Sequence, residues 1–238
     1  MSKIKFSIVI PAHNEEKNIG NAVKSLLGLN YNREDFEIIV VDNASVDKTS
    51  EKAKSAGADK IVLELNKGTN FARERGRLEA SGEIVAFLDG DSEVDPDWLI
   101  KIEKDLSISG VVVVSGPFNY GFKGLRKILD DIYTGHILTV IPQVLFFIFR
   151  RKAGILIGGN FAGFASAFEK IGGFPPLKFW GDDASIAMLI SRKVGRVLFD
   201  PDLRIKSSPR RFEDVGFSYL SFRYVGSYLK IYFSKDYI

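Results

Sequence analysis

At positions 84–91 the chain reads Ile84-Val85-Ala86-Phe87-Leu88-Asp89-Gly90-Asp91. Five consecutive apolar residues that end abruptly in polar ones predict a strand buried on both faces. Two carboxylates separated by one glycine follow that strand directly. In parallel α/β sheets, ligands bind beyond the carboxyl ends of the strands, so Asp89 and Asp91 stand where a binding site is expected.

Apolar runs of the same kind recur on both sides of this strand and alternate with helical patterns. Further strands are predicted at Lys5–Ile10, Phe36–Val41, Ile61–Leu65 and Val111–Val114. Helices are predicted at Asn18–Leu27, Asp47–Ala56, Asn70–Ala80 and Pro96–Leu106, the last with Asp95 as its N-cap. This alternation predicts an α/β fold with a mixed, mostly parallel sheet flanked by helices.

The second half of the chain has a less regular pattern. Between Gly116 and Gly159 the periodicity weakens, and it returns in a predicted helix at about Asp183–Lys193. We therefore expect one domain over residues 1–211 that consists of two halves, residues 1–116 and residues 117–211. Residues 212–238 are expected to form a C-terminal amphipathic helical segment.

The composition sets broad limits. With 238 residues, 45% of them hydrophobic, the chain can bury a core, and it contains no cysteine for a disulfide or a thiolate metal site. Residues 1–119 hold 15 Lys/Arg and 20 Asp/Glu (net −5), whereas residues 120–238 hold 18 and 10 (net +8). The first residues lack a signal-peptide pattern, so a cytoplasmic location is expected.

The residues after the first strand exclude several nucleotide-binding classes. They read Pro11-Ala12-His13-Asn14-Glu15-Glu16, which contains neither a dinucleotide-binding glycine fingerprint nor a P-loop. After the second strand, Asp42-Asn43-Ala44-Ser45 suits either contact with a nucleotide or simple turn formation. A divalent cation bridging to a diphosphate would stabilise the pair Asp89 and Asp91, because hard oxygen ligands suit Mg²⁺ or Mn²⁺.

Taken together, these motifs resemble the family 2 glycosyltransferases, which have the GT-A fold. The resemblance extends from about Phe6 to Phe212 and rests on short motifs in a fixed order: residues 7–16, 40–45, 66–68, 72–73, 82–91, 159–160, 172–174 and 181–183. It implies transfer of a hexosyl or N-acetylhexosaminyl group from a nucleotide-sugar donor, with Mn²⁺ or Mg²⁺ as cofactor.

The resemblance also implies roles for individual residues. Donor-binding positions would be Pro11, Ala12, His13, Glu15, Asp42, Arg73, Asp89, Gly90, Gly159, Asn160, Asp182 and Arg211. Asp91 would ligate the metal directly, with Asp89 beside it, and Asp183 would be the general base. His13 stands where the family usually has Tyr, and Asp182 where Glu is commoner. Either Arg210 or Arg211 would neutralise the leaving diphosphate.

These roles predict a single displacement with inversion at the anomeric carbon, in which Asp183 takes the proton of an acceptor hydroxyl. An ordinary alternative exists for Asp182 and Asp183, because acids at a helix start also cap it and complement its dipole. A phosphate acceptor on a lipid, already ionised, would need little help from a base.

An apolar run at Ile137–Phe149, followed by Arg150-Arg151-Lys152, bears on the acceptor. Its thirteen residues are fewer than the ~20 that span a bilayer. We favour peripheral contact with the inner face of a membrane, by this run and by residues 212–238, and hence a polyprenyl-linked acceptor. Alternatives are a soluble enzyme acting on a free saccharide or glycan, with the run buried or in an oligomer contact, and a non-catalytic nucleotide-sugar-binding protein. No nucleic-acid partner is expected.

Overall fold

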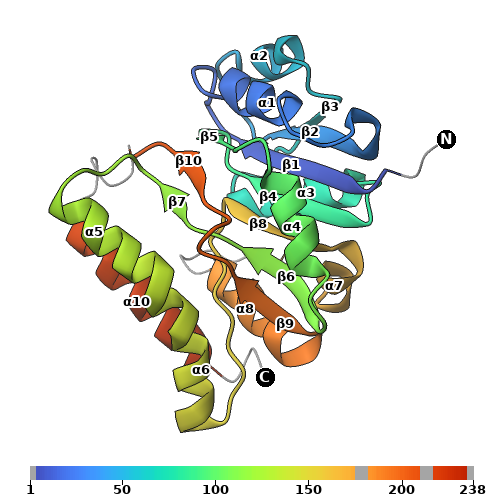
Figure 1. Cartoon of the computed structure of the whole chain (residues 1–238). Coiled ribbons are helices and arrows are strands. Elements are labelled where there is room, and N and C mark those ends of the chain that lie inside the picture. Colours follow the sequence, from blue (N-terminus) through green and yellow to red (C-terminus); the bar gives the residue numbers. More distant parts are fainter. Residues whose placement is uncertain (1–3, 175–181, 210–216, 235–238) are drawn as a thin grey trace.

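The computed structural model describes residues 4–174, 182–209 and 217–234. Their main feature is a seven-stranded sheet in the order β3-β2-β1-β4-β8-β6-β9 (Figure 1). The strands are β1 (Phe6–Ala12), β2 (Phe36–Asp42), β3 (Lys60–Leu63), β4 (Ile84–Leu88), β6 (Val111–Ser115), β8 (Asn160–Phe164) and β9 (Arg196–Phe199). Only β8 is antiparallel to its neighbours in this sheet, which confirms the predicted mixed, mostly parallel sheet.

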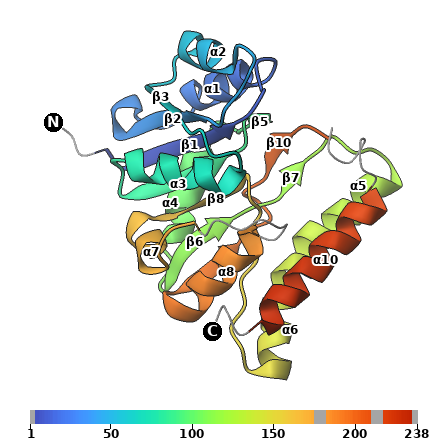
Figure 2. The same cartoon turned by 180° about the vertical axis from the view of Figure 1, so that it is seen from behind.

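Helices cover both faces of the sheet. One face carries α1 (Ile19–Leu27), α2 (Thr49–Ala56) and α4 (Trp98–Leu106), and the other carries α3 (Thr69–Glu79), α7 (Ala165–Lys170) and α8 (Asp182–Lys193) (Figures 1 and 2). Alternate residues of β1 enter the two cores, with Ile8 and Ile10 in one and Val9 in the other. Burial on both sides explains why these strands are continuous apolar runs.

Strand register aligns the residues expected at the site. β1 pairs in parallel with β2 so that Ala12 lies opposite Asp42, and with β4 so that Val9 lies opposite Phe87. The carboxyl ends of three neighbouring strands therefore meet at one edge of the sheet. Beside this edge, a small three-stranded sheet joins β5 (Ser92–Glu93), β10 (Ile205–Ser207) and β7 (Phe118–Asn119).

The least regular part of the sequence forms a long helical arm. α5 (Leu125–Ile132), the π-helical turn η2 (Tyr133–Ile137) and α6 (Leu138–Phe149) follow one another without a break. The arm lies beside α10 (Phe217–Phe233), and both stand apart from the sheet (Figures 1 and 2). The pattern there did not predict a helix, because apolar residues occur on both of its faces and Pro142 lies within it.

The predicted start of α4 was wrong. The helix begins at Trp98 and its N-cap is Asp97, whereas Asp95 was expected to cap it. Asn30 accounts for the difference, since its backbone N–H donates to the carbonyl of Pro96 and its side chain donates to Asp97. These contacts hold residues 95–97 in a turn outside the helix.

Candidate active site

The third helix brings a cation to the carboxyl edge of the sheet. Gly76 of α3 packs so closely on β1 that a Cβ there would lie 2.2 Å from Cγ1 of Val9. Arg73 lies three residues earlier, on the same face of the helix. Only 4% of Arg73 is exposed, so the close packing at Gly76 places a buried guanidinium beside the strand ends.

The guanidinium of Arg73 connects two groups of acids. Its Nη2 lies 3.5 Å from Oδ1 of Asp89 and donates to the backbone carbonyl of Gly158, while its Nη1 lies 3.2 Å from Oδ2 of Asp182. It also lies over the ring of Phe161, 5.7 Å from the centroid. Nε of Arg73 is buried without a hydrogen-bond partner. Because the buried guanidinium of Arg73 contacts both acids, it sets the distance between Asp89 and Asp182.

Asp89 sits in a space that only glycine leaves open. A Cβ on Gly159 would lie 2.1 Å from Oδ2 of Asp89, so any larger residue at 159 would displace the carboxylate. The side chain of Asp89 is 37% exposed, which leaves it accessible to a ligand. On the other side, Gly90 packs against Ala12 and Glu15, and its own Cβ would be at 3.4–3.5 Å from them.

Asp182 and Asp183 begin α8 and differ in their surroundings. Burial, together with repulsion from the charge of Asp182, raises the pKa of Asp183 to about 6, although Arg73 and backbone N–H groups favour its charged form. Oδ1 of Asp183 accepts a hydrogen bond from the N–H of Ala184 at 2.8 Å. A carboxylate with a pKa near neutrality can act as a general base near neutral pH.

The loops after β1 and β2 are joined by polar contacts. Nδ1 of His13 lies 2.7 Å from the carbonyl oxygen of Asn43, and the N–H of Asn14 donates to Oγ of Ser45. Asn14 and Ala44 both have a φ of +56°, so each loop turns sharply at this junction. His13 is exposed and thus accessible to a donor.

Asn43 holds the loop before α3, a role that the sequence did not predict. Its side-chain amide donates to the carbonyls of Glu64 and Asn66 and accepts from the N–H of Gly68. Asn43 is only 6% exposed, and these hydrogen bonds hold the loop before α3 in place. Its position inside a turn motif gave no signal that separated this role from an ordinary turn.

Asp42 occupies the predicted edge, but its carboxylate is used within the protein. It accepts hydrogen bonds from the N–H of Ser45, at 2.9 Å, and from the hydroxyl of Ser50. Only 6% of the residue is exposed. The geometry therefore favours the turn-forming alternative over direct contact with a nucleotide base.

Asn160 was predicted to line the donor sugar, and in the structure its side chain is bonded within the protein. The residue is fully buried; its side chain accepts from Nε1 of Trp98 at 3.1 Å and donates to the carbonyls of Leu203 and Pro117. Every polar atom of the amide is thereby used to join β8, α4 and the segment before β10. Of the two neighbours Gly159 and Asn160, it is Gly159 that lies beside Asp89.

The carboxylates at the carboxyl edge of the sheet suit a metal ion that also takes ligands from a substrate. In the described parts of the chain, no group of three or more His, Cys, Asp or Glu side chains is arranged to hold an ion. Asp89 and Asp91 offer oxygen ligands, and Mg²⁺ typically uses one or two carboxylates together with substrate phosphate oxygens. The two residues thus fit a divalent cation shared with a diphosphate. Arg210 and Arg211 lie outside the described residues.

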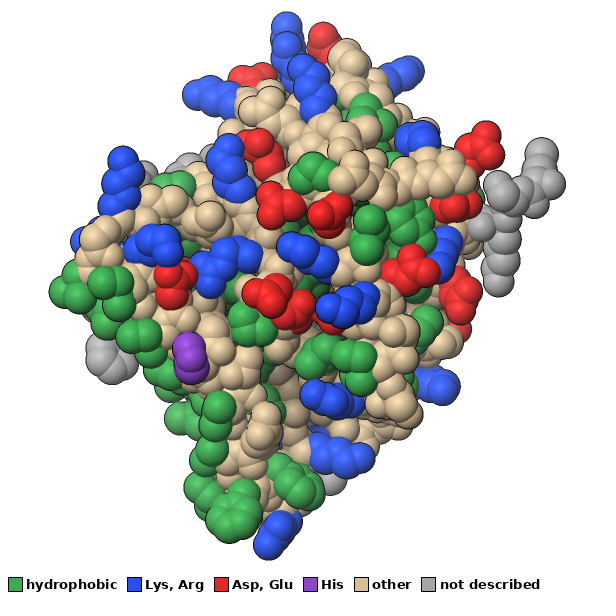
Figure 3. All heavy atoms as spheres, in the orientation of Figure 1, with side chains coloured by type: hydrophobic (Ala, Val, Ile, Leu, Met, Phe, Trp, Pro, Cys, Tyr) green, Lys and Arg blue, Asp and Glu red, His purple; other side chains and the backbone are tan. Residues whose placement is uncertain are grey.

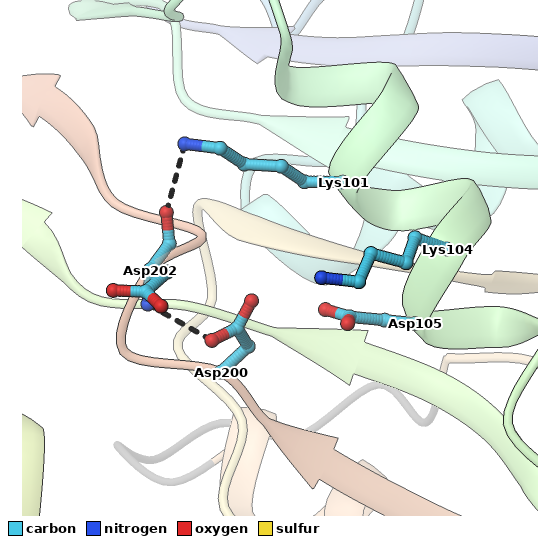
Figure 4. Close-up of a pocket in the computed structure, with 5 residues that line it drawn as sticks. All are labelled: Lys101, Lys104, Asp105, Asp200 and Asp202. Carbon is cyan, nitrogen blue, oxygen red and sulfur yellow. Dashed lines mark hydrogen bonds between the residues drawn. The ribbon is translucent and has the colours of Figure 1, made fainter.

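A hollow lies between α4 and the segment after β9. It has a volume of about 430 Å³ and is lined by Lys101, Lys104, Asp105, Asp200 and Asp202 (Figure 4). Asp105 is 7% exposed and its Oδ2 has no hydrogen-bond partner. Burial and the nearby charge of Asp200 raise the pKa of Asp105 to about 7. A buried carboxyl whose pKa is raised in this way makes the stability of the fold depend on pH.

Comparison with known proteins defines the class to which this fold and site belong. The family model described as "Glycosyl transferase family 2" matches residues 7–172, which is more than half of the chain. The chain therefore belongs to glycosyl transferase family 2. The GT-A fold expected from the sequence motifs is confirmed by solved glycosyltransferases with the same architecture.

Individual relatives are similar over about half of the chain. Glycosyltransferase AglE of Haloferax volcanii is 33% identical over 135 residues, 54% of this chain and 44% of its own length. The dolichol-phosphate mannosyltransferase of Pyrococcus furiosus is 30% identical over 128 residues, 50% of this chain and 35% of its own length. The chain thus spans less than half the length of these two relatives.

A solved structure is similar over more of the chain. The mannosyltransferase PcManGT of Pyrobaculum calidifontis, in complex with GDP-Man and Mn²⁺, superposes with a TM-score of 0.69 and 25% sequence identity. The match covers 86% of this chain and 56% of that one.

Proposed function

We propose that the protein is an inverting, metal-dependent glycosyltransferase that uses a nucleotide-diphosphate sugar. The observation that carries this proposal is the position of Arg73, whose guanidinium joins Asp89 at the donor edge to Asp182 at the start of α8. Through that contact, the carboxylates that would lie beside the donor phosphates and the candidate base, Asp183, would belong to one site. Residues 1–116 would supply the donor half and residues 117–211 the acceptor half.

The residues have separable tasks in this reaction. Asp91, with Asp89, would hold Mn²⁺ or Mg²⁺, which supplies positive charge against the departing nucleoside diphosphate. Pro11, Ala12, His13, Glu15 and Gly90 would form the wall of the donor pocket. Asp183 would take the proton from an acceptor hydroxyl as its oxygen attacks the anomeric carbon, and its pKa of about 6 suits that task near neutral pH.

We propose a lipid-linked acceptor, met at the inner face of a membrane. Support comes from the exposed apolar arm at Leu125–Phe149 and from the similarity to an enzyme named dolichol-phosphate mannosyltransferase. A soluble saccharide acceptor is the alternative. Transfer to a free saccharide without lipid or detergent, at a rate equal to that with a polyprenyl phosphate, would favour it.

A donor panel tests the reaction class. Purine and pyrimidine nucleoside diphosphate sugars would be incubated with Mn²⁺, Mg²⁺ or EDTA, and release of nucleoside diphosphate would be measured. We expect release from one donor class, dependent on metal. Asp91→Asn should remove the metal stimulation, whereas the matched control Glu93→Gln, at a carboxylate held by Lys206 at 3.0 Å, should keep it. Metal-dependent donor binding without turnover on any acceptor would contradict the proposal.

A further inference from the structure

The arm formed by α5, η2 and α6 is apolar on both its inner and its outer face. Its inner face contributes Leu138, at 7% exposure, and the half-buried Ile141 and Leu145 to contacts with the rest of the protein. Large apolar side chains nevertheless cover the outer face, at 45–73% exposure: Leu125, Ile128, Leu129, Ile132, Val140, Val144, Phe147 and Ile148. Figure 3 shows hydrophobic side chains gathered along this edge of the molecule. An exposed apolar surface of this size is typical of a site that contacts a membrane or another protein.

Charges are confined to the two ends of the arm. The sequence from Ile132 to Phe149 contains no Asp, Glu, Lys or Arg. Lys123, Arg126 and Lys127 precede it, and Arg150, Arg151 and Lys152 follow it. The acids near the first end, Asp130 and Asp131, are already paired with Arg204 and Lys127. The outer face is therefore an uncharged apolar strip with an excess of positive charge at both ends.

By length and composition, Leu125–Phe149 is the one helical stretch among the described residues that is able to cross a membrane, and its most apolar part is only 11% buried. This corrects the sequence-based expectation, which counted thirteen residues and judged the run too short. The helix is longer because α5 and η2 precede α6 without a break, and the uncharged stretch within it begins at Ile132.

Both ends of the arm are fixed to the rest of the protein. Near the first end, Arg204 lies 3.3 Å from Asp130 and donates to the hydroxyl of Thr134. Near the other end, the hydroxyl of Tyr232 lies 3.2 Å from the carbonyl oxygens of Leu145 and Arg151. A spanning helix would have to place its ends on opposite sides of a hydrocarbon core ~30 Å thick. Tethering at both ends instead keeps the helix alongside the protein.

We propose that the outer face of the Leu125–Phe149 arm lies flat in the interface of an anionic lipid bilayer, with its axis parallel to the membrane plane. The apolar strip enters the acyl boundary, and the basic residues at both ends contact anionic head groups. This inference rests on the membrane location given under the proposed function and extends it. It does not rest on the proposed reaction, because lipid binding does not require transfer chemistry.

The arm is connected through α10 to the helix that begins with the candidate base. α10 supports the inner side of the arm, since Phe149 packs against Tyr232 and Phe233 with ring centroids at 6.0 and 5.1 Å. Tyr232 also packs with Ala184 and Met188 of α8, the helix that begins with Asp182 and Asp183. An arm lying in the interface thus holds the candidate base at a fixed height above the membrane.

Vesicle sedimentation tests the surface. The probe is vesicles made from equal parts of phosphatidylglycerol and phosphatidylcholine, compared with pure phosphatidylcholine, at low salt. Phe147→Glu combined with Val140→Glu should weaken binding by about tenfold or more, because two exposed apolar groups that would enter the acyl boundary are replaced by charges. Leu78→Glu, at an equally exposed apolar residue on α3, should bind like the wild type. Arg126→Gln with Lys152→Gln should weaken the preference for anionic vesicles, because two of the six basic residues at the ends of the arm are neutralised.

The absence of cysteine allows the orientation to be measured with single labels. Ile128→Cys, Val140→Cys and Phe147→Cys would each carry an environment-sensitive fluorophore and be exposed to lipids brominated at different depths. A flat arm predicts the same shallow quenching depth at all three positions. A central label deeper than both outer ones would indicate a spanning helix and overturn the proposal.

Other results would also contradict it. Equal vesicle binding by the wild type and the double Glu variant would exclude this face, as would a concentration-dependent dimer that dissociates in the double variant without any lipid binding. Nucleoside diphosphate release in detergent-free buffer separates the two proposals. If release persists while vesicle binding fails, only the membrane inference fails; if binding persists without release, only the proposed chemistry fails.

Discussion

The guanidinium of Arg73 lies 3.2 Å from a carboxylate oxygen of Asp182, a contact between residues 109 positions apart in the chain. It connects α3 to α8 across the carboxyl edge of the sheet. Because Arg73 also contacts Asp89, one buried cation sets the distance between the donor edge and the candidate base. Removing it should affect both stability and activity.

We expect Arg73→Ala to lower the free energy of unfolding by about 1–3 kcal/mol; this is less than for a fully buried pair, because solvent reaches both acids. Donor hydrolysis should also fall sharply. Urea unfolding would measure the first effect. The matched control is Arg75→Ala on the same helix, whose exposed pair with Glu79 should be worth at most about 1 kcal/mol. Equal losses in the two variants would contradict a special role for Arg73.

Gly159→Ala should displace the carboxylate of Asp89, because the added Cβ would lie 2.1 Å from Oδ2. We expect metal-dependent donor affinity to fall about tenfold or more, as an ~1 Å misplacement of a site group commonly produces large losses. Titration calorimetry with donor and Mn²⁺ would measure it. Gly20→Ala is the control, since a Cβ on that helical glycine meets nothing within 4 Å and should leave binding unchanged.

Asp183→Asn should preserve donor binding while transfer to a hydroxyl acceptor falls by ~10²–10⁴-fold, the usual contribution of a general base. Single-turnover kinetics would show it. In the wild type, kcat/KM should rise as the pH increases through about 6 and then level, because the base acts in its deprotonated form. Transfer by Asp183→Asn at the wild-type rate would rule out this role for a hydroxyl acceptor.

Asp105 should make stability depend on pH. Its folded-state pKa is raised from 3.8 to about 7, so the stabilisation present below about pH 4 is lost as the pH rises through 7. Asp105→Asn should remove that slope and raise the free energy of unfolding at pH 8 by about 1–3 kcal/mol, less than the full pKa difference because solvent in the hollow screens the charge.

Thermal or urea unfolding at several pH values would test this. Asp202→Asn, at the exposed rim of the same hollow, should change stability by less than about 0.5 kcal/mol. A steeper fall in stability with pH after Asp105→Asn would show that the sign of the shift is wrong.

The local sequence was sufficient for the elements that line the donor edge. Ile84–Leu88 was predicted with its observed limits, and Asp89 follows it at the sheet edge as expected. A strand buried on both faces must be apolar throughout, and its carboxyl end is marked by the first polar residue, so both features can be read without the fold. The family motifs then predicted which residues surround this edge.

Other properties depended on which side chains met across the fold. The sequence could not show that the Asn160 amide is hydrogen-bonded inside the core or that Asp42 bonds to its own turn. It also could not show that Arg73 lies between two groups of acids. These contacts depend on the direction of each side chain after distant elements pack, which spacing along the chain does not encode.

The arm shows the same division most clearly. The sequence by itself determined that Ile137–Phe149 is apolar and followed by basic residues, because composition is a local property. Only the tertiary structure decided that the helix begins at Leu125, is tethered at both ends and leaves an apolar face uncovered. An apolar pattern indicates that a surface avoids water, but whether the rest of the chain covers that surface is decided by tertiary packing.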